Sequence, residues 1–137
     1  MGNAYRNLSL IFAAGGFGGL VKAIVAWLFG ALGINALLGS SLAPALTPPW
    51  IYQHMVWGGI WALLFLLPLR RLSYPALGVL YSLPQSLVML LVVMPKMGLA
   101  GPWGLGWGRI TPVLILFFGV IWGLATGLWL KVARESK

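Results

Sequence analysis

Long apolar stretches, interrupted by glycine far more often than by charge, dominate this chain. A helix needs about 18–25 apolar residues to cross the hydrocarbon core of a bilayer. Four stretches meet that length, and they predict transmembrane helices over residues 8–34, 51–69, 75–94 and 111–130. The pattern therefore predicts an all-α integral membrane protein, with residues 1–137 forming a single four-helix transmembrane domain.

The lysines and arginines outside these spans gather on one side. Six would share the side of the N-terminus: Arg6, Arg70, Arg71, Lys131, Arg134 and Lys137. Only Lys96 and Arg109 would lie opposite. Because cytoplasmic loops carry the excess of basic residues, we expect both termini to be cytoplasmic. Arg70, Arg71, Lys131 and Arg134 are also placed to contact anionic lipid head groups.

Composition agrees with a location in the membrane. Hydrophobic residues make up 61% of the chain and charged residues 7%, whereas soluble domains average roughly 45–50% and 25%. The chain has no cysteine, which excludes disulfides and thiolate metal sites. Its basic residues lie beside apolar segments, so we interpret them as topology signals and lipid contacts and expect no binding to nucleic acid.

Lys22 is the most unusual residue, because it lies about 20 Å into the first predicted span. A lysine at that depth costs roughly 2.5–3.5 kcal/mol. The chain has no Asp and one Glu, Glu135, near its C-terminus. We expect Lys22 to face the bundle interior, a wet cavity or a subunit boundary. It either contacts an anion or lipid phosphate, acts as a deprotonated buried amine, or bonds structurally to carbonyls freed by glycine or proline.

Neutral polar residues lie at a similar depth in the third predicted span, around Pro84. Proline removes a helical hydrogen bond and frees a carbonyl near position 80, which serine and glutamine side chains can satisfy. Broken helices mark binding sites in transporters, although many are plain kinks. The candidates for a pore or ligand site are Lys22, Ser82, Pro84, Gln85, Ser86 and, near the outer end of the second span, His54.

His54 is the only histidine in the chain. One histidine with no cysteine and no nearby carboxylate does not make a metal site, so we expect no bound metal. A bond from the ring to a carbonyl or a lipid is the simpler expectation.

Small residues form the clearest packing signal. Gly119, Gly123 and Gly127 make two overlapping GxxxG steps, and Gly15 and Gly19 make another. Helices in lipid associate through such close backbone approaches. These faces either pack within one four-helix bundle or join copies of the chain in a homo-oligomer.

The two halves of the chain share short similarities. The segment GGIWALL at 58–64 can be placed beside GVIWGLA at 119–125, which is consistent with a parallel two-span repeat. Trp57, Trp61 and Trp122 belong to these segments and are candidates for an apolar pocket, with ordinary packing as the alternative.

Three segments resemble the YagU-like bacterial inner-membrane proteins. They are GGFGGLVKAIVAW at 15–27, HMVWGGIWALLF at 54–65 and ALGVLYSLPQSLVMLLVVMPKMGLAGP at 76–102. The resemblance covers about half of the chain and contains no catalytic signature. It implies a multi-pass protein of the bacterial inner membrane whose role is open, with a link to acid tolerance.

The absence of carboxylates within the spans limits the possible functions. A general acid–base pair, an acidic proton relay and a nucleophile–base pair are all missing from the sequence, so we expect neither an enzyme nor a cofactor. Three function classes remain. The favoured one is a non-catalytic protein that self-assembles or joins a larger membrane complex through its glycine-rich faces. The others are a small oligomeric channel or carrier for an anion or neutral solute, lined by Lys22 and Gln85, and a protein that binds lipid or a hydrophobic cofactor.

Overall fold

A computed structural model describes residues 2–40, 46–66, 73–93, 105–106 and 108–135 of the chain. Within these ranges the structure is helical and contains no strand. In chain order the elements are α1 (Gly2–Ala31), α2 (Ile34–Leu37), α3 (Pro48–Trp61), the 3₁₀-helix η1 (Ala62–Leu66), α4 (Tyr74–Val88), the π-helix η2 (Met89–Val93) and α5 (Thr111–Glu135).

Three helices are long and apolar enough to cross a membrane: Tyr5–Ala31, Tyr74–Val93 and Thr111–Ala133. They match the first, third and fourth predicted spans. The second predicted span, 51–69, is not among them. Regular α-helix ends at Trp61 and leaves α3 only 14 residues long, and residues 67–69 lie outside the described ranges. The prediction of an all-α protein is therefore confirmed for the described residues, and three of the four predicted spans correspond to membrane-capable helices.

The starts of α3 and α4 follow the same local chemistry. Thr47 and Ser73 cap these helices through their side-chain oxygens, which accept hydrogen bonds from the backbone N–H groups of Trp50 and Ala76. Both helices carry proline in the first turn, where its missing N–H costs nothing. These signals fix where each helix begins.

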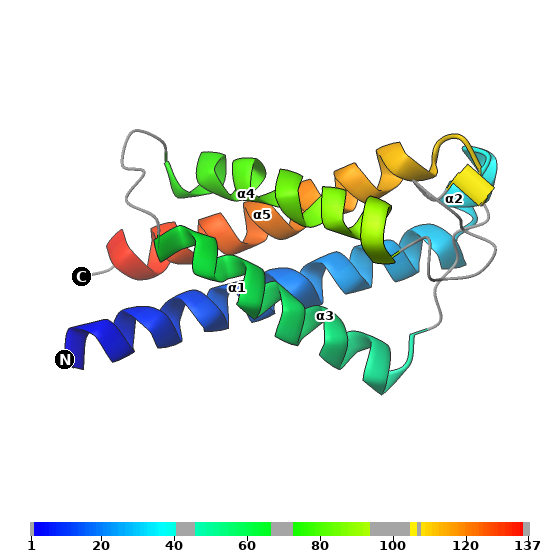
Figure 1. Cartoon of the computed structure of the whole chain (residues 1–137). Coiled ribbons are helices and arrows are strands. Elements are labelled where there is room, and N and C mark those ends of the chain that lie inside the picture. Colours follow the sequence, from blue (N-terminus) through cyan, green and yellow to red (C-terminus); the bar gives the residue numbers. More distant parts are fainter. Residues whose placement is uncertain (1, 41–45, 67–72, 94–104, 107, 136–137) are drawn as a thin grey trace.

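The helices alternate in direction, so both described ends of the chain lie at the same end of the bundle, which we call the terminal end (Figure 1). The opposite end, the loop end, holds α2 and the start of α5. There the hydroxyls of Ser40 and Thr111 lie 2.7 Å apart and are both buried. This bond ties the connection after α1 to the first residue of α5.

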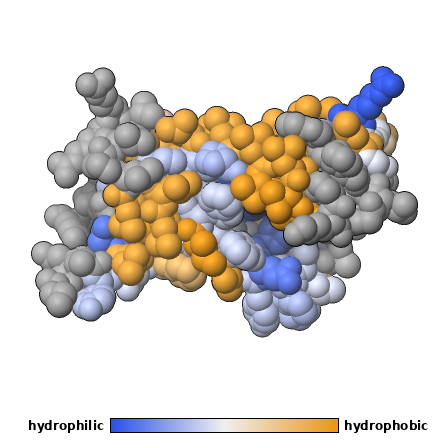
Figure 2. Space-filling view, viewed as in Figure 1, coloured by the Kyte–Doolittle hydropathy of each residue, from blue (hydrophilic) through white to orange (hydrophobic). Residues whose placement is uncertain are grey.

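The bundle is apolar both inside and outside. Its fully buried large side chains include Ile11, Phe118, Trp122 and Leu130. Many large apolar side chains on the outer faces are exposed, and orange apolar surface covers much of the face in Figure 2. An outward apolar surface of this extent suits contact with lipid.

Candidate functional site

Two helical hairpins form the framework of the candidate site, and the first is the pair α1 and α3. A Cβ atom added at Gly15 would overlap the Gly58 carbonyl oxygen, and one added at Gly19 would lie 2.8 Å from the carbonyl carbon of His54. The two backbones are therefore in direct contact. Glycine is required at these positions because any side chain would separate the helices.

The second hairpin, α4 with α5, is built in the same way. A Cβ added at Gly78 would lie 3.0 Å from the Cα of Gly123, and one added at Gly127 would lie 2.7 Å from the Cα of Pro75. Gly119 packs against the Ser86 hydroxyl. The predicted glycine faces, Gly15, Gly19, Gly119, Gly123 and Gly127, are thus occupied by contacts within the chain.

The hairpins dock on each other through α1 and α5. Trp122 of α5 packs against α1 at Gly18. Its indole ring extends to α3, where a Cβ added at Gly58 would lie 3.0 Å from the Trp122 Nε1. Toward the terminal end, the rings of Phe17 and Trp129 lie 4.8 Å apart between centroids. Trp122 therefore fills the space between α5, α1 and α3, and it is fully buried.

Lys22 lies on the inner side of α1. It follows Gly18 and Gly19 by one helical turn, and those glycines contact α5 and α3 respectively. Residues three and four positions apart share a helix face, so Lys22 faces the space between α3 and α5, where its side chain is half-buried.

His54 is the neighbour of Lys22 on α3. Its Nδ1 lies 2.9 Å from the Trp50 carbonyl oxygen, and the two rings lie 4.4 Å apart between centroids. The His54 backbone packs against Gly19, which lies one helical turn before Lys22, so His54 lies near Lys22 across the α1–α3 contact. His54 is therefore held by a backbone carbonyl of its own helix, and no group of three metal-ligating side chains occurs among the described residues.

On α4, three polar side chains predicted for the site face inward. Ser82 donates a 2.6 Å hydrogen bond to the Val79 carbonyl, and Ser86 contacts Gly119. Gln85 is only 7% exposed. Pro84 is exposed on the outer face, so it shapes the helix from outside the bundle and does not line the interior.

Several buried polar atoms have no hydrogen-bond partner among the described residues. They are the side-chain oxygen of Gln85, the indole Nε1 of Trp122, and the hydroxyls of Thr126 and Tyr81. Buried polar groups are nearly always paired. We call Lys22, His54, Gln85, Ser86 and Trp122 the polar layer. They come from α1, α3, α4 and α5, and each lies at, or within one helical turn of, a contact that a glycine makes between two helices.

The predicted tryptophan pocket is only partly assembled. Trp122 belongs to the buried core cluster, and half-buried Trp61 packs against that cluster. Trp57 is instead 57% exposed. Sequence reasoning named Thr126 as a possible partner of Lys22 but missed Gly78 and Tyr81. A spacing of four between Gly78 and Ser82, a small-xxx-small step, was the available signal for Gly78.

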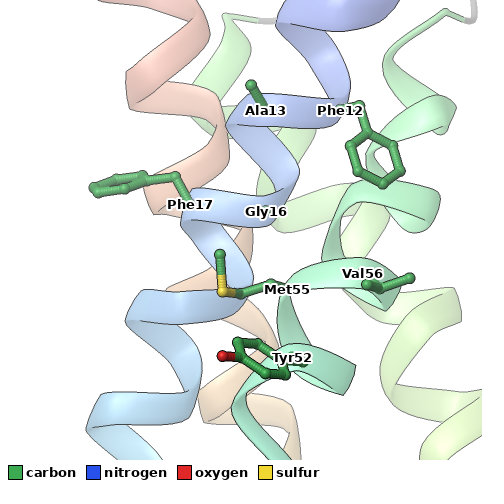
Figure 3. A pocket seen from close by; sticks show the side chains of 7 residues that line it. All are labelled: Phe12, Ala13, Gly16, Phe17, Tyr52, Met55 and Val56. Atoms are coloured by element: carbon green, nitrogen blue, oxygen red, sulfur yellow. The ribbon is translucent and has the colours of Figure 1, made fainter. Parts of the chain in front are cut away.

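The surface of the bundle also has two apolar grooves. The first lies between α1 and α3 on the outer face, as Figure 3 shows, and is lined by Phe12, Ala13, Gly16, Phe17, Tyr52, Met55 and Val56. The second runs between α1 and α5 and includes Leu10, Val21, Leu128 and Trp129. Neither groove includes Lys22, so both are lipid-facing features separate from the polar layer.

The lipid-contact candidates can be placed only in part. Lys131 is exposed at the terminal end, on the same end as Arg6, which is also exposed. Arg70 and Arg71 lie outside the described residues, and the Arg134 side chain does too.

The fold and the polar layer define the class of this protein as a helical membrane protein with three membrane-capable helices. No family model matches the chain, and no curated protein or solved structure matches it. The resemblance to YagU-like proteins stays a prediction.

Proposed function

We propose that α3 and η1 together form a fourth membrane crossing. The two elements follow each other without a break, with 14 residues of α-helix and 5 of 3₁₀-helix. At rises of about 1.5 and 2.0 Å per residue they span roughly 30 Å. That length equals the thickness of a typical hydrocarbon core.

The orientation that we propose places the terminal end in the cytoplasm. Arg6 and Lys131 are exposed at that end, and Arg109 is exposed toward the loop end. Together with the predicted six-to-two distribution of basic residues, this supports cytoplasmic termini. The bacterial inner membrane is the proposed location.

The function that the geometry supports best is that of a non-catalytic carrier or channel, which binds an anion or a polar solute at the polar layer. The observation that carries this proposal is Lys22, an inward-facing, half-buried cation in a chain whose only carboxylate side chain is Glu135. An unpaired charge inside a membrane protein is costly and is usually functional. An anion would supply the missing partner.

Two other residues of the polar layer have groups that suit such a ligand. Trp122 can donate a hydrogen bond through its unpartnered Nε1–H, and Gln85 can donate or accept through its amide. Hydrogen bonds between an ammonium and an anion are stronger than neutral ones. The site therefore combines one full charge with neutral donors, which suits a small anionic group.

Self-assembly through glycine faces is less well supported than ligand binding. The glycine steps that suggested it are filled by contacts between α1 and α3 and between α4 and α5. An oligomer would have to use other surfaces. Membership of a larger membrane complex stays a prediction.

Native mass spectrometry of the full chain in a neutral detergent tests the proposal, with inorganic phosphate and dodecyl phosphate as separate probes. We expect the wild-type chain to bind at least one probe, and Lys22→Gln to bind it about tenfold more weakly or worse. Arg109→Gln, which removes an exposed cation, is the matched control and should behave like the wild type. Equal binding by Lys22→Gln, or no binding by the wild type, would refute the proposal.

A further inference from the structure

The two hairpins repeat the same crossing. In each hairpin two glycines meet, Gly15 with Gly58 and Gly78 with Gly123, and a Cβ on any one of them would overlap the carbonyl oxygen of its partner. The first helix of each pair carries Ala-x-Gly, at 13–15 and 76–78. The second carries Val-Trp-Gly at 56–58 or Ile-Trp-Gly at 121–123.

Aligning the two hairpins by these glycine contacts shifts α3 relative to α5 by one helical turn from the alignment of GGIWALL with GVIWGLA. The contacts make Gly58 equivalent to Gly123, whereas that sequence match places it beside Gly119. Superposing the crossings makes Lys22 equivalent to Gln85, since each follows its crossing glycine by seven residues. The two side chains that define the polar layer therefore occupy the same position in the two hairpins.

The two boundaries between the hairpins are not equivalent. Where α1 meets α5, Gly18 leaves room for Trp122, which is fully buried. In the other boundary, the α3–α4 seam, Tyr81 stands at the position equivalent to Gly18. Tyr81 packs edge-on against Phe65 of η1 at 4.9 Å. Trp57, the equivalent of Trp122, is 57% exposed.

Tyr81 therefore closes the α3–α4 seam at η1, and Trp57 borders the seam without filling it. From η1 toward the loop end, α3 and α4 diverge (Figure 1). In the same view, hydrophilic residues lie recessed between apolar surfaces (Figure 2). The seam faces the side of the bundle, which is the lipid side in the proposed orientation.

We propose that the α3–α4 seam is a lateral opening through which the anionic head of an amphipathic molecule reaches Lys22 and Gln85 while its tail stays in the bilayer. The inference rests on the proposed function, because it requires an anion at Lys22. A phosphate or carboxylate head matches the lysine charge and the donors of Gln85 and Trp122.

The chain lacks cysteine, so single cysteines can be labelled at the opening. Trp57→Cys, carrying an apolar maleimide label, places a bulky group in the seam. Val56→Cys with the same label is the matched control, because Val56 is 49% exposed at the same depth but lines the groove on the opposite side of α3. Dodecyl phosphate and inorganic phosphate are then titrated into the full chain in neutral detergent.

We expect dodecyl phosphate to bind more tightly than inorganic phosphate, and labelled Trp57→Cys to lose dodecyl phosphate binding. Unlabelled Trp57→Cys and labelled Val56→Cys should keep it, while Lys22→Gln weakens it by about tenfold or more. Lateral entry is overturned if the Trp57 label has no effect, or if the amphiphile binds no better than phosphate alone. Unchanged binding in Lys22→Gln would instead overturn the proposed function.

Discussion

At the scale of single residues, the candidate site consists of polar side chains that the bundle turns inward, beside glycines that bring the helix backbones into contact. Lys22, Ser82, Gln85 and Ser86 were predicted because polar residues are rare in the spans, and the structure turns all four inward. Tyr81 was missed, since an isolated hydroxyl in an apolar helix has no periodic signal. Its importance depends on which helices meet, which local pattern does not encode.

Glycine at the hairpin crossings is expected to be irreplaceable. Gly78→Ala would place a methyl group against the Gly123 backbone, with its Cα only 3.0 Å away, and should destabilise the fold by about 1–3 kcal/mol. Gly16→Ala is the control, because its Cβ would meet nothing nearer than the Met55 carbonyl oxygen at 3.6 Å. Unfolding in a mixed-micelle denaturant titration measures both, and a Gly78→Ala variant as stable as Gly16→Ala would contradict the packing.

Replacing Lys22 distinguishes a binding role from a structural role, because the two roles predict opposite changes in the free energy of unfolding. If the lysine waits for a ligand, Lys22→Met should stabilise the ligand-free chain, by up to about 2.5–3.5 kcal/mol, because an unpaired charge is removed. A lysine that bonds structurally to freed carbonyls would give the opposite sign. The same denaturant titration, in buffer free of phosphate, decides between them.

At the scale of elements, apolar length predicted α1, α4 and α5 well and α3 less well. The three membrane-capable helices are 27, 20 and 23 residues long, and the second reaches its length because η2 continues α4. The second predicted span changes to 3₁₀-helix after Trp61, shortly before Pro68. The residue before a proline disfavours α-helix, and 3₁₀ turns are common at helix ends. Tertiary context set the exact boundary.

The crossing formed by α3 and η1 can be tested with cysteines at its two ends. Thr47→Cys and Ser73→Cys flank the segment, and both residues are exposed. We expect a membrane-impermeant maleimide to label Thr47→Cys from the periplasmic side of intact cells, and Ser73→Cys only after the cells are opened. Labelling of both from one side would show that the segment does not cross.

At the scale of the whole molecule, the sequence suggested a two-span repeat but did not show which residues of the two halves are equivalent. Composition and apolar length were enough to indicate a small helical bundle. The equivalence of Lys22 with Gln85, and the contrast between Gly18 and Tyr81, became visible only when the glycine crossings fixed the register. The proposed lateral opening rests on this contrast between the two boundaries of the hairpins.

The indole N–H resonance of Trp122 provides the most direct test of the polar layer, because its Nε1 is buried and lacks a partner. Inorganic phosphate and dodecyl phosphate are added separately to the ¹⁵N-labelled full chain in neutral detergent. We expect at least one ligand to shift the Trp122 indole peak saturably, the Trp129 peak to stay in place, and Lys22→Gln to abolish the shift at the same ligand concentration. No saturable shift in the wild type, or the same shift in Lys22→Gln, would contradict an anion site at Lys22.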